Sequence, residues 1–279
     1  MKIIFLGDIV GRAGRTVVEE QLPGLRDRLG IDFVIANGEN AAAGFGITGK
    51  LCGQLFDAGV DVITTGNHIW DQREIMSYIA QEPRLLRPIN FPPGTPGRGV
   101  CSYTDRRGRR IVVMNAMGRV FMDPLEDPFA LVGAELDKAR MGVGGVGGAA
   151  GGAVKAVFID FHGEATSEKM AMGHFADGRA SAVVGTHSHV PTADAQILPG
   201  GTGYQTDAGM CGDYNSVIGM DKAEPLQRFT RKISGGRFEA ARGDATLCGF
   251  VVDTDDATGL ARSVAPLRVG GRLSQTIPE

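Results

Sequence analysis

The first 70 residues alternate between short apolar runs and longer stretches in which apolar side chains recur at helical spacing. The runs at 3–6, 33–36 and 60–64 predict buried strands, because strands covered on both faces are apolar at nearly every position. The stretches at 14–29 and 49–58 predict helices. Strands that alternate with helices indicate βαβ units and a mainly parallel sheet.

The middle of the chain continues the alternation less regularly. Strands are predicted at 111–114, 154–161 and 180–184, and helices at about 128–140 and 164–176. Residues 83–96 hold five of the 13 prolines, which predicts an irregular loop.

The C-terminal part has a different pattern. From residue 238 onward, short β-like runs without helical periodicity predict a second, more antiparallel sheet.

Residues 142–152 contain seven glycines in eleven positions, which predicts a flexible surface loop without an assigned function. Since neither an internal repeat nor a linker stands out, we expect residues 1–279 to form one α/β domain with two sheets.

Five of the predicted strands end in a polar cluster that contains or adjoins glycine. These clusters are Gly7-Asp8, Asn37-Gly38-Glu39-Asn40, Gly66-Asn67-His68, His162-Gly163-Glu164 and Gly185-Thr186-His187-Ser188-His189. Ligands of open α/β sheets bind outside the carboxyl ends of the strands, so we expect the five clusters to converge on one crevice. Four of the five histidines lie in them, and the fifth, His174, falls inside a predicted helix, where we assign it no role.

The residue types in these clusters suit metal ions. Carboxylate and amide oxygens with imidazole, and without thiolate, favour Mn²⁺, Fe or Zn²⁺. Each cluster alone also has an ordinary structural role, since an aspartate after a strand commonly caps a helix or forms a turn. Five such clusters at successive strand ends favour a dinuclear site, because seven candidate ligands exceed what one tetrahedral ion takes.

Residues 44–51 match two nucleotide-binding patterns, G-x-G-x-x-G and G-x-x-x-x-G-K. The dinucleotide pattern requires its first glycine directly after a strand, whereas seven residues separate Gly44 from the strand here. The phosphate-binding loop requires Ser or Thr after Lys50, and Leu51 stands there instead. A glycine-rich loop that leads into a helix capped near Thr48 is the favoured interpretation.

Composition narrows the class of protein further. Lys and Arg number 29 against 32 Asp and Glu, a net charge of -3, which argues against a protein built to coat nucleic acid. The four cysteines form no C-x-x-C pair, and no apolar run approaches the ~20 residues of a membrane span. We therefore expect a cytoplasmic protein that makes no contact with membranes.

The arginines at 106–110 could steer phosphate or RNA, but a solvated turn is the favoured interpretation.

The ordered clusters resemble the motifs of calcineurin-like metallophosphoesterases, and more closely those of the bacterial YmdB-like group. The shared stretches lie at 7–11, 37–41, 65–71, 160–169 and 185–194, and 206–210 also fits. Two features depart from the broad superfamily: Val10 stands where a histidine is usual, and Glu39 stands where aspartate is common. Both departures match the YmdB-like group.

The resemblance implies a four-layer αββα sandwich and phosphodiesterase activity on small phosphodiesters, with 2′,3′-cyclic nucleotides as the expected substrates. It also implies two metal ions, Fe or Mn, with Zn as an alternative. By resemblance, the first ion is held by Asp8, Asn40 and His189, the second by Asn67, His162 and His187, and Glu39 bridges the two. A homo-oligomer is a family-level expectation.

The resulting hypothesis is hydrolysis by a hydroxide that the two ions share, with His68 as the acid that protonates the leaving oxygen. His68 adjoins the candidate ligand Asn67 and is not itself needed as a ligand. The alternative is a regulatory or RNA-associated protein in which the phosphoesterase site is secondary. A kinase or dehydrogenase built on residues 44–50 ranks below both.

Overall fold

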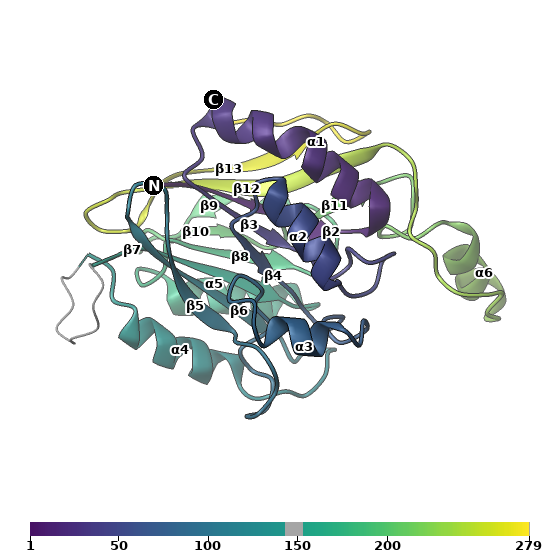
Figure 1. The fold of residues 1–279 in the computed structure, drawn as a ribbon, viewed down its shortest axis with the longest axis horizontal. Coiled ribbons are helices and arrows are strands. Elements are labelled where there is room, and N and C mark those ends of the chain that lie inside the picture. Colours follow the sequence, from purple (N-terminus) through teal and green to yellow (C-terminus); the bar gives the residue numbers. More distant parts are fainter. Residues whose placement is uncertain (143–152, 279) are drawn as a thin grey trace.

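A computed structural model describes residues 1–142 and 153–278. Its helices are α1 (Gly11–Leu29), α2 (Gly49–Asp57), α3 (Ile75–Ile79), α4 (Pro128–Lys138), α5 (Thr166–Ala176) and α6 (Ala223–Arg231). Its strands are β1 (Lys2–Leu6), β2 (Asp8–Ile9), β3 (Phe33–Asn37), β4 (Val62–Thr64), β5 (Val100–Thr104), β6 (Arg110–Met117), β7 (Val154–His162), β8 (Ala182–Thr186), β9 (Gln196–Ile197), β10 (Gly203–Gln205), β11 (Met210–Asp213), β12 (Ala245–Thr254) and β13 (Ala261–Val269). The strands form two sheets that pack face to face (Figure 1).

The first sheet has the order β2-β11-β12-β1-β3-β4, and β13 pairs with β12. Its centre is parallel, since β1 pairs in parallel with β3 and β3 with β4. The second sheet has the order β5-β6-β7-β8-β10-β9, with parallel pairing from β6 through β10. The predicted strands at 3–6, 33–36 and 60–64 are therefore confirmed as neighbours in a parallel sheet.

Alternate side chains of the central strands point to two different cores. On β1, Ile3 and Phe5 pack between the sheets, whereas Ile4 and Leu6 face the helices on the outer side. Phe5 meets Phe158 of the opposite sheet with ring centroids 5.1 Å apart. This period-two division explains why the strands read as unbroken apolar runs, because both faces of each sheet are covered.

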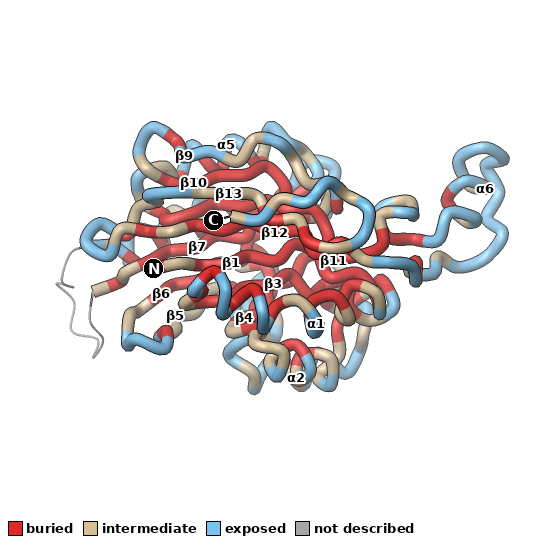
Figure 2. The backbone as a smooth tube through the Cα atoms, turned by 90° about the horizontal axis from the view of Figure 1, so that it is seen from above, coloured by how far each residue is buried: buried red, intermediate tan, exposed pale blue. Residues whose placement is uncertain are grey.

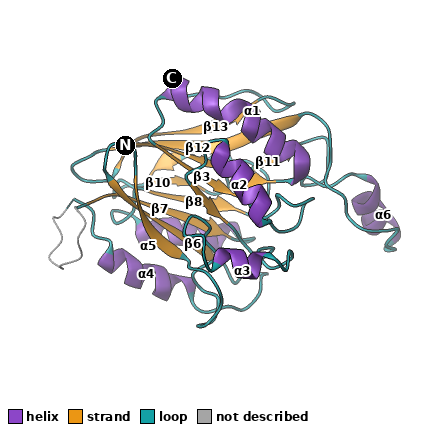
Figure 3. Cartoon of the chain, in the orientation of Figure 1, coloured by secondary structure: helices purple, strands orange, loops and turns teal. Residues whose placement is uncertain are grey.

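Helices cover the two outer faces of the sandwich (Figure 3). The amphipathic helix α1 packs on β11 and β12 and adjoins α2, and α4 and α5 pack on β6, β7 and β8. Buried backbone fills the middle of the molecule, and exposed backbone lies on the helices and loops at its outside (Figure 2). The four-layer αββα sandwich expected from the sequence is confirmed.

One prediction about the sheets was wrong. The C-terminal strands β12 and β13 do pair antiparallel, but they extend the first sheet, because β12 lies antiparallel to β1 with Leu6 opposite Gly249. The second sheet comes instead from the middle of the chain. Residues 143–152 of the glycine tract lie outside the described residues.

The glycine-rich segment at 44–51 behaves as a loop that leads into a helix. Thr48 caps α2, and its side chain accepts a hydrogen bond from the backbone N–H of Leu51. Among the described residues, no helix is long and apolar enough to cross a membrane.

Candidate metal centre

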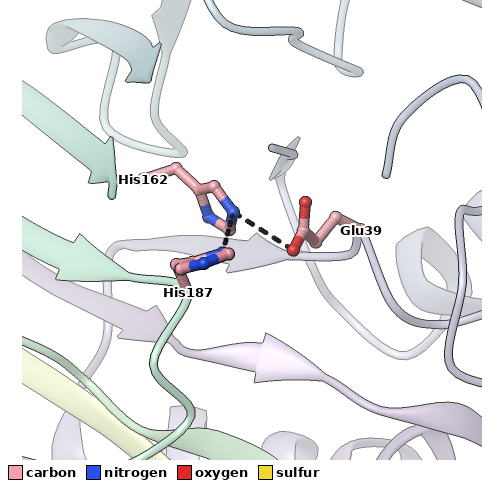
Figure 4. Close-up of side chains that lie close together, drawn as sticks. All are labelled: Glu39, His162 and His187. Atoms are coloured by element: carbon pink, nitrogen blue, oxygen red, sulfur yellow. Dashed lines mark hydrogen bonds and ion pairs between the residues drawn. The ribbon is translucent and has the colours of Figure 1, made fainter. Parts of the chain in front are cut away.

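Two groups of metal-ligand side chains meet at the carboxyl ends of the strands, and they share one carboxylate. Glu39, His162 and His187 form one group, and Asp8, Glu39 and His189 form the other. Within each group the candidate ligand atoms all lie within 4.8 Å of one another. The residues come from both sheets, so the face-to-face packing of the sheets builds the centre (Figure 4).

The Nε2 atom of His162 is the centre of the first group. It lies 3.0 Å from Oδ1 of Asn67, 3.1 Å from Nδ1 of His187 and 3.2 Å from Oε1 of Glu39. Ligand atoms bonded to one transition-metal ion at about 2.0–2.2 Å lie roughly 3.0–3.5 Å from each other. His162 Nε2 therefore lies at the spacing of a coordination shell from each of the other three atoms.

Each histidine of the centre has one ring nitrogen bonded away from the cluster. His162 Nδ1 lies 2.9 Å from the hydroxyl of Thr186, which donates in turn to the buried carboxylate of Asp160 at 2.7 Å. This chain fixes the ring of His162 and leaves Nε2 facing the cluster. Partners of this kind orient metal-binding imidazoles and raise their basicity.

His187 and His189 follow the same rule with different partners. His187 Nε2 lies 3.2 Å from the carboxylate of Glu164, so its Nδ1 is the atom that faces His162. His189 Nδ1 lies 2.7 Å from the carbonyl oxygen of Ile218. Because a carbonyl oxygen only accepts, Nδ1 carries the proton and Nε2 remains available to a metal ion.

Two buried oxygens of the centre are left with no hydrogen-bond partner among the described residues. They are Oδ1 of Asp8 and Oδ1 of Asn40. The amide of Asn40 is held by its other end, since Nδ2 donates to the carbonyl of Gly44 at 3.0 Å. A buried polar atom without a partner is costly, and a metal ion would satisfy both oxygens. The donors present thus fit a metal centre.

The loop that carries His187 and His189 is held in a strained conformation. His187 and His189 both have positive φ, 94° and 64°, which non-glycine residues rarely adopt. Below the loop, the carboxylate of Asp207 accepts from the backbone N–H of Ser188 at 3.1 Å and pairs with the buried Lys169 at 2.7 Å. The Lys169–Asp207 pair therefore fixes the loop, and strain of this kind is typical of functional sites.

Gly66 leaves no room for a side chain. A Cβ at this position would lie 2.3 Å from Oε2 of Glu39 and 2.3 Å from Nε2 of His162. The glycine that precedes Asn67 thus allows the backbone of this loop to approach the ligand atoms closely.

The buried charges of the centre shift one another's pKa values. Burial raises the pKa of Asp8 to about 7, although His189 and His162 oppose this shift. Burial would also raise the pKa of Glu39, but the neighbouring His162 outweighs it and lowers that pKa to about 2. Burial would lower the pKa of His162, but the neighbouring Glu39 raises it to about 9. Burial and the neighbouring His162 lower the pKa of His187 to about 3. The pKa shifts of Glu39 and His162 share one cause, the contact of 3.2 Å between carboxylate and imidazole.

His68 lies at the edge of the centre rather than inside it. Its Nδ1 lies 2.7 Å from the carboxylate of Asp71, and its ring meets the edge of Phe45 with centroids 5.2 Å apart. Its backbone N–H donates to Glu39 at 3.2 Å. With Nδ1 held by Asp71, Nε2 is the ring atom that can exchange a proton with a bound molecule.

A cavity of about 380 Å³ adjoins the centre. The polar part of its lining consists of Glu39, Asn40, His68, Glu164, His187, Ser188 and His189. The remaining wall is largely apolar and includes residues on both sides of α6 in the chain. A larger hollow of about 530 Å³ lies beside α1, lined by none of the candidate ligands.

The strand-end clusters predicted from the sequence do converge on one site. His174 and the arginines at 106–110 lie outside this site. His174 is exposed on α5, away from the centre. The arginine cluster lies at the opposite end of the strands, where Arg109 pairs with Asp32 and Asp105, and Arg107 pairs with Asp32. Glu164 stands in one of the strand-end clusters and Asp71 in a motif that carries the resemblance, but neither has a role predicted from the sequence; the structure shows that both hold histidines of the site.

Comparison with known proteins agrees with this geometry. A family model described as "YmdB-like protein" matches residues 4–267. The chain is 48% identical over 258 residues to a 2′,3′-cyclic-nucleotide 2′-phosphodiesterase of Bacillus subtilis (strain 168), which covers 92% of this chain and 93% of that protein. A crystal structure of a novel phosphatase from Mycoplasma pneumoniae superposes with a TM-score of 0.87 at 32% identity, over 97% of this chain and 93% of that one. A crystal structure of a protein from Thermus thermophilus also has a TM-score of 0.87, at 40% identity over 97% of this chain and 100% of that one.

Proposed function

The chain belongs to the YmdB-like protein family, and on this premise we propose that it hydrolyses 2′,3′-cyclic nucleotides with the help of two metal ions. Its relatives are phosphodiesterases and phosphatases, so it is a hydrolase that acts on phosphoester bonds. The cyclic-nucleotide substrate rests on the B. subtilis relative, which this chain matches over nearly its whole length. We further propose that residues 1–279 work as one metallophosphoesterase domain.

The observation that carries the proposal is the position of Glu39 in both ligand groups. A carboxylate between two sets of imidazole and oxygen donors suits a pair of neighbouring ions that share one ligand. Its low pKa keeps the carboxylate charged at neutral pH. A single structural ion would not need a shared ligand.

The proposed ligands follow the two groups. Asp8, Asn40 and His189 would hold one ion, Asn67, His162 and His187 would hold the other, and Glu39 would bridge them. The absence of thiolate and the mixture of imidazole and oxygen donors favour Fe or Mn. Because Val10 offers no donor to the first ion, the partnerless amide oxygen of Asn40 is the candidate that replaces the usual imidazole there.

When bound, the two ions would polarise the phosphoryl oxygens and lower the pKa of water from 15.7 towards about 7. The chain's own residues supply the rest. His68 faces the cavity beside the candidate ligands, so its Nε2 can donate a proton to the ribose oxygen that leaves phosphorus. The carboxylate of Asp71 accepts from Nδ1 and so orients the imidazole.

The test is hydrolysis of 2′,3′-cyclic AMP by the protein loaded with Mn²⁺, with 3′,5′-cyclic AMP and p-nitrophenyl phosphate measured in parallel. We expect the 2′,3′-cyclic ester to be cleaved with the highest kcat/KM of the three. A protein with its metals verified as bound that leaves the 2′,3′-cyclic ester intact would contradict the proposed substrate.

A further inference from the structure

Residues 215–240, named the arm here, begin and end against the sandwich and carry α6 away from it. Figures 1 and 2 both show α6 beyond the body of the molecule, on the side opposite the N-terminus. Leu226, Phe229 and Ile233 of the arm are exposed, Phe229 to 72%. Such large apolar side chains in solvent indicate that something binds to the arm.

The arm is an ordered element. The carboxylate of Glu224 accepts from the guanidinium of Arg228 at 2.6 Å and from the backbone N–H of Gly235, which closes the loop after α6. The guanidinium of Arg228 also lies over the ring of Phe238, 4.0 Å from its centroid. At the root of the arm, the backbone N–H of Asp221 donates to the carbonyl of Glu239 at 2.8 Å. The arm therefore presents its apolar side chains in a defined arrangement.

The inner side of the arm forms the apolar wall of the cavity beside the metal centre. Its lining residues are Val217, Ile218, Met220, Pro225, Phe229 and Phe238, none of which has a polar side chain. Phe45 adds an aromatic ring to the same lining, next to His68. The lining of the cavity thus has a polar part that suits a phosphate on metal ions and an apolar part that suits a flat, apolar group.

We propose that the arm binds the nucleobase of the substrate, and that Phe229 and Phe238 are its specificity-determining residues. This inference rests on the proposed function, because it places the base relative to a phosphate held at the metal centre. A ligand with a charged cyclic phosphate joined through ribose to an aromatic base matches the polar and the apolar parts of this lining. Its volume of about 380 Å³ lies in the range of small-molecule sites.

The chemistry of the wall predicts which bases are accepted. Stacking on aromatic side chains tolerates every base, because every base has a π face. Since the arm residues that line the cavity carry no side-chain hydrogen-bond donor or acceptor, we expect no recognition of base edges by the arm. The larger stacking surface of purines then favours them over pyrimidines.

The root of the arm is joined directly to the metal centre. Ile218 has a φ of +46°, which a β-branched residue rarely adopts, and its carbonyl oxygen accepts the Nδ1–H of His189 at 2.7 Å. The backbone that orients this candidate ligand therefore also begins the arm. This contact fixes the position of the base wall relative to the candidate ligands.

The experiment measures KM and kcat for Phe229→Ala and Phe238→Ala with 2′,3′-cyclic AMP and with the 2,3-cyclic phosphate of methyl ribofuranoside, which has no base. We expect each variant to raise KM for the nucleotide about 5- to 150-fold, the range for loss of one base–aromatic contact. KM for the baseless ester should change less than twofold. Phe229→Trp should restore the nucleotide KM, and Leu226→Ala, an exposed arm residue outside the cavity lining, should leave it unchanged.

The outcomes separate the two proposals. If wild type cleaves neither cyclic ester with its metals bound, the proposed function fails. If wild type cleaves 2′,3′-cyclic AMP and Phe229→Ala has an unchanged KM, the base-binding arm is wrong. A sedimentation shift from oligomer to monomer in Phe229→Ala, with KM unchanged, would assign the arm to contact with a second copy and would likewise overturn the inference.

Discussion

The Nε2 atom of His162 lies 3.2 Å from Oε1 of Glu39, so two residues from different sheets are in contact at the carboxyl ends of the strands. β7 of the second sheet ends at His162, and Glu39 follows β3 of the first. Either sheet alone would present only part of the ligand set. The centre therefore depends on how the two sheets pack as much as on its own residues.

Replacement of His187 by alanine is expected to lower metal content. The substitution removes a candidate ligand atom that lies 3.1 Å from His162 Nε2. Metal analysis after dialysis should find at least one ion fewer per chain than in wild type. His174→Ala is the matched control, because His174 is exposed on α5 and should retain the wild-type content. Full occupancy in His187→Ala would exclude His187 as a ligand.

His68→Ala is expected to keep its metal ions and lose turnover. Because His68 lies at the edge of the centre and is held by Asp71, its removal deletes an acid without deleting a ligand. Loss of general acid catalysis typically lowers the rate about 10²–10⁴-fold. Asp71→Asn should lower kcat less, since the imidazole remains. A His68→Ala protein that has lost its metals would show that the assigned role is wrong.

Gly66→Ala is expected to disrupt the centre through one methyl group. The new Cβ would lie 2.3 Å from both Glu39 and His162, which are buried and cannot move aside freely. We expect both metal content and activity to fall. Gly53→Ala on α2 is the control, because its Cβ meets nothing within 4 Å and alanine favours a helix. Wild-type activity in Gly66→Ala would contradict the described packing.

Lys169→Met is expected to destabilise the fold. It would leave the buried carboxylate of Asp207 without its partner at 2.7 Å, and breaking such a pair typically costs about 3–5 kcal/mol. Urea denaturation measures the free energy of unfolding. Lys138→Met provides the comparison, since the exposed Lys138–Glu135 pair should be worth at most about 1 kcal/mol. Equal effects of the two substitutions would refute a structural role for the buried pair.

Much of the centre could be predicted because its residues follow strands. Asp8, Glu39, Asn67 and His162 come soon after apolar runs, and parallel strands bring their carboxyl ends to one edge. Each of these residues can be recognised from its own strand, although the contacts between them join distant parts of the chain. A separate local argument ranks a phosphate-binding role of Lys50 low, because its neighbour Leu51 lacks the hydroxyl that such a loop requires.

The remaining features depend on contacts between distant segments. The pairing of Gly249 with Leu6 joins strands from opposite ends of the chain. The residues of an apolar strand do not show which other strand it will pair with. The bond between His189 and the carbonyl of Ile218 involves a backbone atom, which residue identity does not reveal. The short helix α6 was missed because its apolar side chains face solvent and the cavity instead of a core.

The most direct test of the dinuclear centre is a metal titration of activity. Protein stripped with chelator and verified as metal-free is supplied with increasing Mn²⁺, and bound metal and hydrolysis of 2′,3′-cyclic AMP are measured in the same samples. We predict no hydrolysis without metal and full activity only when two ions are bound per chain. Hydrolysis that persists in the metal-free protein, or that is complete with one ion bound, would contradict a centre in which Glu39 bridges two ions.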